Sequence, residues 1–148
     1  MLGAGYDAAM RIIPLLALSL LAACQPADDS PASTGGTVAA IAPADLAGSY
    51  RVGSAGGAPV DQPEAIAATL TASRIDVQSG CIRFAYDYRL AGGVLTTTSA
   101  PVASCRRALT PAEQAVQQAF AAAKQVARTA GNGVEFSGNG RSVTLFAQ

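Results

Sequence analysis

Hydrophobic and polar residues alternate over several short stretches after Leu46, which is the pattern of half-buried β-strands. The clearest stretch runs from Cys81 to Leu90, where every second residue from Ile82 onward is large and apolar. Ala91-Gly92-Gly93 then predicts a hairpin turn, and residues 94–99 predict the returning strand. The chain therefore predicts a mainly β domain, with its further strands at residues 48–53, 65–71, 73–78, 134–137 and 142–147.

A single helix interrupts these strands. Residues 110–113 (TPAE) place threonine at the N-cap, proline at the first helical position and glutamate at the third, which is a capping box. An apolar stripe continues from residue 112 to residue 127, and basic residues and Gly131 suit the end of such a helix. We expect Phe120 to be the central anchor of the helix against the sheet.

The amino terminus has the features of a targeting segment. An apolar run from Ile12 to Ala23 follows Arg11, and it is shorter than the roughly 20 residues that a spanning helix needs. Residues 21–24 (LAAC) match the lipobox of bacterial lipoproteins, which predicts a signal peptide over residues 1–23 and a lipidated Cys24. Met10 would give a more regular signal peptide than Met1. The alternative is an ordinary signal peptide with a chance cysteine.

The segment after Cys24 differs in composition from the rest. Residues 25–45 are mostly Pro, Ala, Gly, Ser and Asp, which cannot bury enough apolar area to offset chain entropy. We therefore expect residues 24–45 to be a lipidated, disordered tether and residues 46–148 to be the folded domain. Gln25, where a retention signal would have Asp, predicts the outer membrane, with the domain facing the periplasm.

Composition excludes several functions. Ten Lys plus Arg balance ten Asp plus Glu, so the electrostatic signature of a nucleic-acid binder is missing. The chain has no histidine, which excludes a Ser/His/Asp or Cys/His pair and any zinc site that uses histidine. The acids Asp61, Glu64, Asp76 and Asp87 are best interpreted as solvated charges. We expect no enzyme activity, no metal and no cofactor.

Two cysteines remain once Cys24 is assigned to lipid. In an exported protein, Cys81 and Cys105 are most simply a disulfide, which would stabilise the domain by roughly 3 kcal/mol for a loop of about 25 residues. A thiolate metal pair would need further ligands, and a redox-active dithiol would normally have a CxxC spacing. Both alternatives stay open.

Residues 80–146 resemble the META domain of HslJ-like heat-shock lipoproteins. The residues that carry the resemblance are Gly80, Cys81, Phe84 and Tyr88 of the strand motif, Cys105, and Glu113 and Phe120 of the helix. The family's asparagine after the first cysteine is Ile82 here, and its glycine before the last tyrosine is Tyr86. The resemblance implies a small antiparallel β-barrel or strongly curved sheet with one packed α-helix, no catalytic residue, and a link to envelope stress or tolerance of toxic compounds.

The leading hypothesis is a monomeric, non-enzymatic, lipid-anchored envelope protein with an unidentified protein or small-molecule partner. One alternative is a periplasmic inhibitor of a cell-wall-degrading enzyme, for which Arg106 and Arg107 are the candidate contacts. Another is a ligand-binding barrel, although aromatic residues at strand spacing usually form plain core. The aromatic residues in question are Tyr50, Phe84, Tyr86, Tyr88 and Phe136.

Overall fold

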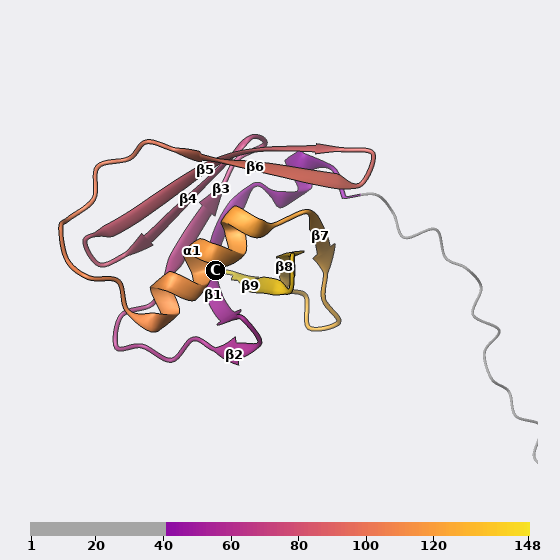
Figure 1. Cartoon of the computed structure of the whole chain (residues 1–148). Coiled ribbons are helices and arrows are strands. Elements are labelled where there is room, and N and C mark those ends of the chain that lie inside the picture. Colours follow the sequence, from indigo (N-terminus) through magenta and orange to yellow (C-terminus); the bar gives the residue numbers. More distant parts are fainter. Residues whose placement is uncertain (1–40) are drawn as a thin grey trace, which may run out of the picture. The chain divides into compact units, whose positions relative to one another are not determined.

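The computed structural model describes residues 41–148, and Cys24, the predicted signal peptide and most of the predicted tether lie outside that part. Within it, one sheet of antiparallel strands curves around a single helix (Figure 1). The elements, in chain order, are the 3-10 helix η1 (Pro43–Leu46), β1 (Gly48–Ala55), β2 (Ala58–Pro59), β3 (Ala67–Leu70), β4 (Arg74–Ser79), β5 (Ile82–Ala91), β6 (Val94–Ala100), α1 (Pro111–Ala122), β7 (Gln125–Arg128), β8 (Val134–Gly138) and β9 (Arg141–Ala147).

The sheet is a nearly closed barrel, as the resemblance implies. Its strands follow the order β6-β5-β4-β3-β1-β9-β8-β7, and the short β2 pairs only with β1. The two end strands approach one another where the amide of Leu95 donates to the carbonyl oxygen of Lys124 at 2.8 Å. Adjacent strands are joined by tight turns such as Asn139-Gly140, whose positive φ angles of 52° and 73° suit a hairpin of this twist.

The helix α1 packs with one face against the inner side of the curved sheet, and its other face, with Gln114 and Ala121, is exposed. Thr110 caps it as predicted: its hydroxyl accepts from the amide of Glu113 at 3.2 Å, and the Glu113 carboxylate accepts from the amide of Thr110 at 2.8 Å. Phe120 is fully buried, with its ring centroid 5.8 Å from that of Tyr86 and 5.3 Å from that of Phe136. The edge-on geometry of the second pair favours tight packing, so the helix and both walls of the barrel share one core.

The predicted end of the helix is wrong. The helix stops at Ala122, Ala123 is extended, and Gln125–Arg128 forms β7 in place of a last helical turn before Gly131. The reason is non-local: the amide of Lys124 donates to the carbonyl oxygen of Ser137, and its own carbonyl oxygen accepts from β6. Strand pairing on both sides of Lys124 thus satisfies its backbone N–H and C=O groups, which would otherwise form hydrogen bonds within a longer helix.

The folded part begins before the predicted boundary at Leu46. The carbonyl oxygen of Pro43 accepts from the Tyr88 hydroxyl at 3.4 Å, and that of Asp45 accepts from Arg128 at 3.1 Å. The last residues of the predicted tether are therefore part of the domain. In the described part of the chain, no helix has the length and apolar character needed to cross a membrane.

Candidate functional site

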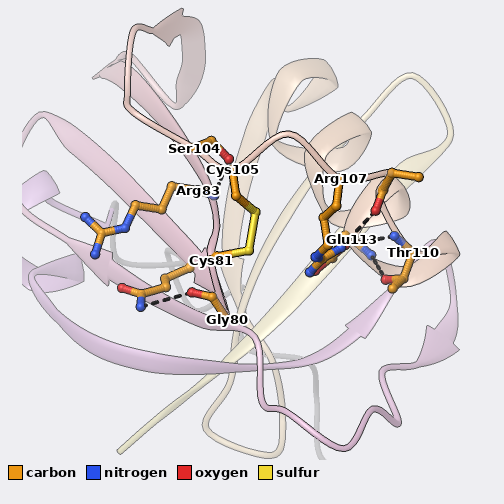
Figure 2. Close-up of a disulfide and its surroundings, with 10 residues drawn as sticks. Gly80, Cys81, Arg83, Ser104, Cys105, Arg107, Thr110 and Glu113 are labelled. Carbon is orange, nitrogen blue, oxygen red and sulfur yellow. Dashed lines mark hydrogen bonds and ion pairs between the residues drawn. A yellow bond between two sulfur atoms is a disulfide. The ribbon is translucent and has the colours of Figure 1, made fainter.

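The residues that suggested the family resemblance separate into two groups in space. Gly80 and Cys81 in the turn between β4 and β5, Cys105 in the loop before α1, and Glu113 in the first turn of α1 gather at one end of the barrel (Figure 2). Phe84, Tyr88 and Phe120 are core residues instead. We call the first group, together with Arg107, the cysteine-end cluster.

The cysteines of this cluster form a disulfide. Cys81 and Cys105 are bonded, with their Cα atoms 5.6 Å apart, and the amide of Cys105 donates to the carbonyl oxygen of Cys81 at 3.3 Å. One residue before Cys105, the hydroxyl of Ser104 accepts from the amide of Arg83 at 3.0 Å. The loop after β6 is thus attached to the first residues of β5.

Glu113 is the one charged residue that is fully buried in the described part of the chain. Its carboxylate accepts from both terminal nitrogens of Arg107, at 2.7 and 2.5 Å, in addition to the amide of Thr110. The fork of an arginine matches a carboxylate in this two-point geometry, which makes the pair strong and well oriented. The sequence predicted the capping role of Glu113 but gave no signal for its burial or its partner.

These contacts decide the charge state of the pair. Hydrogen bonding to Arg107 is the main cause that lowers the pKa of Glu113, and hydrogen bonds from Ser79 and from the amide of Thr110 act in the same direction. Against the opposing effect of burial, these contacts together bring that pKa to about 2. The pKa of Arg107 is raised, chiefly by the same hydrogen bond. Glu113 is therefore ionised at neutral pH with its oxygens occupied, so it is poorly suited to take or give a proton.

Two loops complete the cluster. Gly80 has a φ of 56°, and a Cβ added there would lie 2.5 Å from a carboxylate oxygen of Glu64. The amide oxygen of Gln62 accepts from the Thr110 hydroxyl at 3.0 Å, while its amide nitrogen is buried without a partner among the described residues. Nothing in the sequence indicates that Gln62, Glu64 and Ser79 join this cluster, because no local pattern relates them to a helix start about 30 to 50 residues later.

Arg106 and Arg107 have different surroundings, although they are neighbours. Arg106 is exposed in the loop before α1. The side chain of Arg107 is 39% exposed, but both terminal nitrogens of its guanidinium are held by Glu113, and one of them also donates to the carbonyl oxygen of Ala108. Arg107 is thus a structural partner of the helix, in contrast to the free surface contact that an inhibitor loop would present.

The aromatic residues that were candidates for a ligand cavity form core. Tyr50, Tyr86 and Tyr88 are buried, and each donates its hydroxyl to a backbone carbonyl oxygen, at 2.9, 2.9 and 2.6 Å respectively. Burial raises the pKa of Tyr86 to about 12. Phe84 and Phe136 are buried as well. Side chains whose polar atoms are already satisfied by the protein's own backbone fill the barrel and leave little for a ligand to contact.

A surface hollow of about 580 Å³ lies far from the cysteine-end cluster along β5. It is open, and its lining mixes polar residues such as Ser73, Asp87 and Thr96 with apolar ones such as Pro43 and Leu90. Asp87 and Arg74 form an ion pair there at 3.3 Å, with the Asp87 side chain 65% exposed. Residues 41–148 contain no group of three or more acidic or cysteine side chains placed to hold a metal ion.

A nearly closed antiparallel barrel around one helix, with a disulfide beside the start of that helix, defines a class of small β-barrel domain. The chain belongs to the META domain family, whose sequence model matches residues 44–148. Among curated proteins, none matches this chain. A solved structure, the NMR structure of a protein from Burkholderia xenovorans, is 23% identical, with a TM-score of 0.44, over 68% of this chain and 81% of that one.

Proposed function

We propose that this META domain is a non-enzymatic, lipid-anchored protein of the cell envelope, held at the outer membrane with its domain in the periplasm. In this proposal it supports envelope integrity under stress or exposure to toxic compounds. The observation that carries the non-enzymatic part is the state of Glu113. Its carboxylate is fully buried, ionised and held by Arg107 and Thr110, so the most unusual acid of the described domain is used for structure.

The disulfide supports the proposed location. Disulfides form and persist in oxidising compartments and are rare in the cytosol. The Cys81–Cys105 bond is therefore what an exported domain would have, in agreement with the lipobox at residues 21–24. A lipid on Cys24 would hold the protein at the membrane by burying acyl chains, each methylene contributing about 0.8 kcal/mol.

Mass spectrometry of the protein purified from its native envelope tests the anchor directly. We expect an acylated amino-terminal fragment that begins at Cys24 and a separate linked pair of fragments that contain Cys81 and Cys105. The matched control is Cys24→Ser, which should leave the domain folded but release it from the membrane fraction. An unmodified Cys24 in protein that still sediments with membranes would contradict lipid anchoring.

A growth test addresses the proposed role. Cells that lack the protein should be more sensitive to detergents and other toxic compounds, and wild-type protein should restore tolerance. Cys24→Ser should restore less, because the domain would no longer be held at the membrane. Full tolerance without the protein would count against a role in envelope stress.

The exposed loop before α1 supports a second candidate, an inhibitor of a cell-wall-degrading enzyme. Residues 101–104 and 106–108 are exposed, and Arg106 is the basic side chain there that is not held by Glu113. Capture of purified envelope hydrolases by wild-type protein, and loss of capture with Arg106→Ala, would favour it. Unchanged capture by that variant would exclude a contact centred on Arg106.

A further inference from the structure

The disulfide of the cysteine-end cluster joins a loop to the start of a strand and lies outside the strand pairs of the barrel. Both cysteines lie outside the strands, Cys81 just before β5 and Cys105 after β6. The two strands are already paired over seven residue pairs, from Ala85 with Ala100 to Ala91 with Val94. The bond therefore adds only the attachment of residues 101–105 to the start of β5.

Other contacts of this loop are few. Before Arg107, its hydrogen bonds to the rest of the domain run from the amide of Arg83 to Ser104 and from the amide of Cys105 to Cys81. Residues 101–104 and 106 are exposed. Segments with few buried contacts and exposed hydrogen bonds are the first to open in a folded protein. From Arg107 onward the pair with Glu113 holds the chain to α1.

The two cysteine residues differ in exposure. Cys81 is exposed, whereas Cys105 is half-buried and packs against the core. Thiol–disulfide exchange depends on access of the attacking thiolate to a sulfur atom. Because Cys81 is the exposed residue of the pair, an incoming thiolate would approach the bond from its side.

We propose that the Cys81–Cys105 bond is a site of reversible reduction by a dithiol, such as a thioredoxin-type protein, and that its reduction releases residues 101–106 from a barrel that stays folded. A thiolate of the dithiol bonds to Sγ of Cys81, and Sγ of Cys105 leaves as a thiolate that takes up a proton. The second sulfur of the dithiol then bonds to its first sulfur, which breaks the mixed disulfide and releases Cys81 as a thiol. Two electrons and two protons pass to the cysteines, and the dithiol becomes a disulfide. This inference goes beyond the proposed function and does not depend on how the protein is anchored.

The test uses the oxidised full chain without denaturant, treated with dithiothreitol or with a reduced thioredoxin-type protein. Alkylation reports the two thiols, and amide exchange by NMR reports the amides of Arg83 and Cys105. Brief trypsin treatment reports the peptide bond after Arg106. We expect both thiols to become alkylated, and exchange at both amides and cleavage after Arg106 to rise roughly tenfold or more, as for a local opening. The peptide bond after Lys124, next to β7, and the peptide bond after Arg141, within β9, should stay intact.

Matched variants separate the disulfide from the other contacts. Cys81→Ser combined with Cys105→Ser should show rapid cleavage without reductant and no further change with it. Ser104→Ala removes the acceptor for Arg83 but keeps the disulfide, so it should still need reductant for rapid cleavage. If the double variant fails to fold, the wild-type measurement decides.

Three results would overturn the inference. Thiols that react only after denaturant unfolds the barrel would mean that Cys81 is closed to exchange. Alkylation without faster cleavage after Arg106 would mean that other contacts hold the loop. Cleavage after Arg141 as fast as after Arg106 would mean that the bond staples the whole barrel.

Discussion

Glu113→Gln should remove one of the larger single contributions to the stability of this domain. The amide is close to the carboxylate in size and can still accept from the amide of Thr110, but it carries no charge for Arg107. Taking the pKa of Glu113 from an ordinary 4.5 to about 2 corresponds to about 3 kcal/mol, at about 1.4 kcal/mol per pH unit. The Arg107 side chain is 39% exposed to screening water, so we expect a loss of about 2 kcal/mol at pH 7.

The sign of the pH dependence follows from the direction of the shift. A carboxyl group whose pKa is lower in the folded state stabilises the fold above its unfolded pKa, and this contribution is lost as the pH falls through the folded pKa. For Glu113 the window runs from about pH 4.5 down to about 2. The wild type should lose its contribution across that window, and the Gln variant should lack that part of the acid destabilisation.

Urea unfolding with the disulfide intact, followed at pH 7, 4 and 2.5, measures both effects. Asp61→Asn is the matched control, because it also neutralises an acid, but an exposed one. A Glu113→Gln protein as stable as wild type at pH 7 would refute the reasoning. So would a variant whose stability falls with acid as steeply as that of the wild type.

Two further predictions concern the core and the end of the helix. Phe120→Ala should lower the free energy of unfolding by about 3–5 kcal/mol, because it leaves a cavity between the helix and the barrel walls. Phe146→Ala, at a site 42% exposed, should lower it clearly less in the same urea experiment. Gly138→Ala should cost more than 2 kcal/mol, roughly the scale of severe core overpacking, since its Cβ would overlap the carbonyl oxygen of Ala122. Gly140→Ala meets no atom within 4 Å and should cost only about 1 kcal/mol for its positive φ. Equal thermal shifts for the two glycine variants would show that β8 does not need this close approach.

Features set by neighbouring residues were predictable from the sequence. The alternation from Cys81 to Leu90 identified β5 and its buried face, and Thr110 and Glu113 fixed the start of α1. The META domain resemblance gave the barrel with one packed helix, and the disulfide followed from the cysteine count.

Features set by distant residues were not predictable. Lys124 leaves the helical path because Ser137 and Leu95 offer strand pairing on both sides. The sequence from Ala112 onward has a continuous apolar stripe of helical spacing, and nothing in that pattern indicates pairing with Ser137 or Leu95. The ion pair of the cysteine-end cluster is of the same kind, because Arg107 lies six residues before Glu113, in a loop whose path depends on Cys105. The strand β2 was missed because two residues are too few to show the alternation of apolar and polar positions that identifies a strand.

The position of Pro43 has a consequence for how the domain is presented. Its carbonyl oxygen accepts a hydrogen bond from Tyr88 near the far end of β5, whereas Cys81 lies just before the first residue of that strand. Cys81 and Tyr88 are seven residues apart along extended chain, which separates them by roughly 23 Å at about 3.3 Å per residue. The chain therefore enters the domain near Tyr88, and the disulfide and the arginines before α1 lie toward the opposite end of β5.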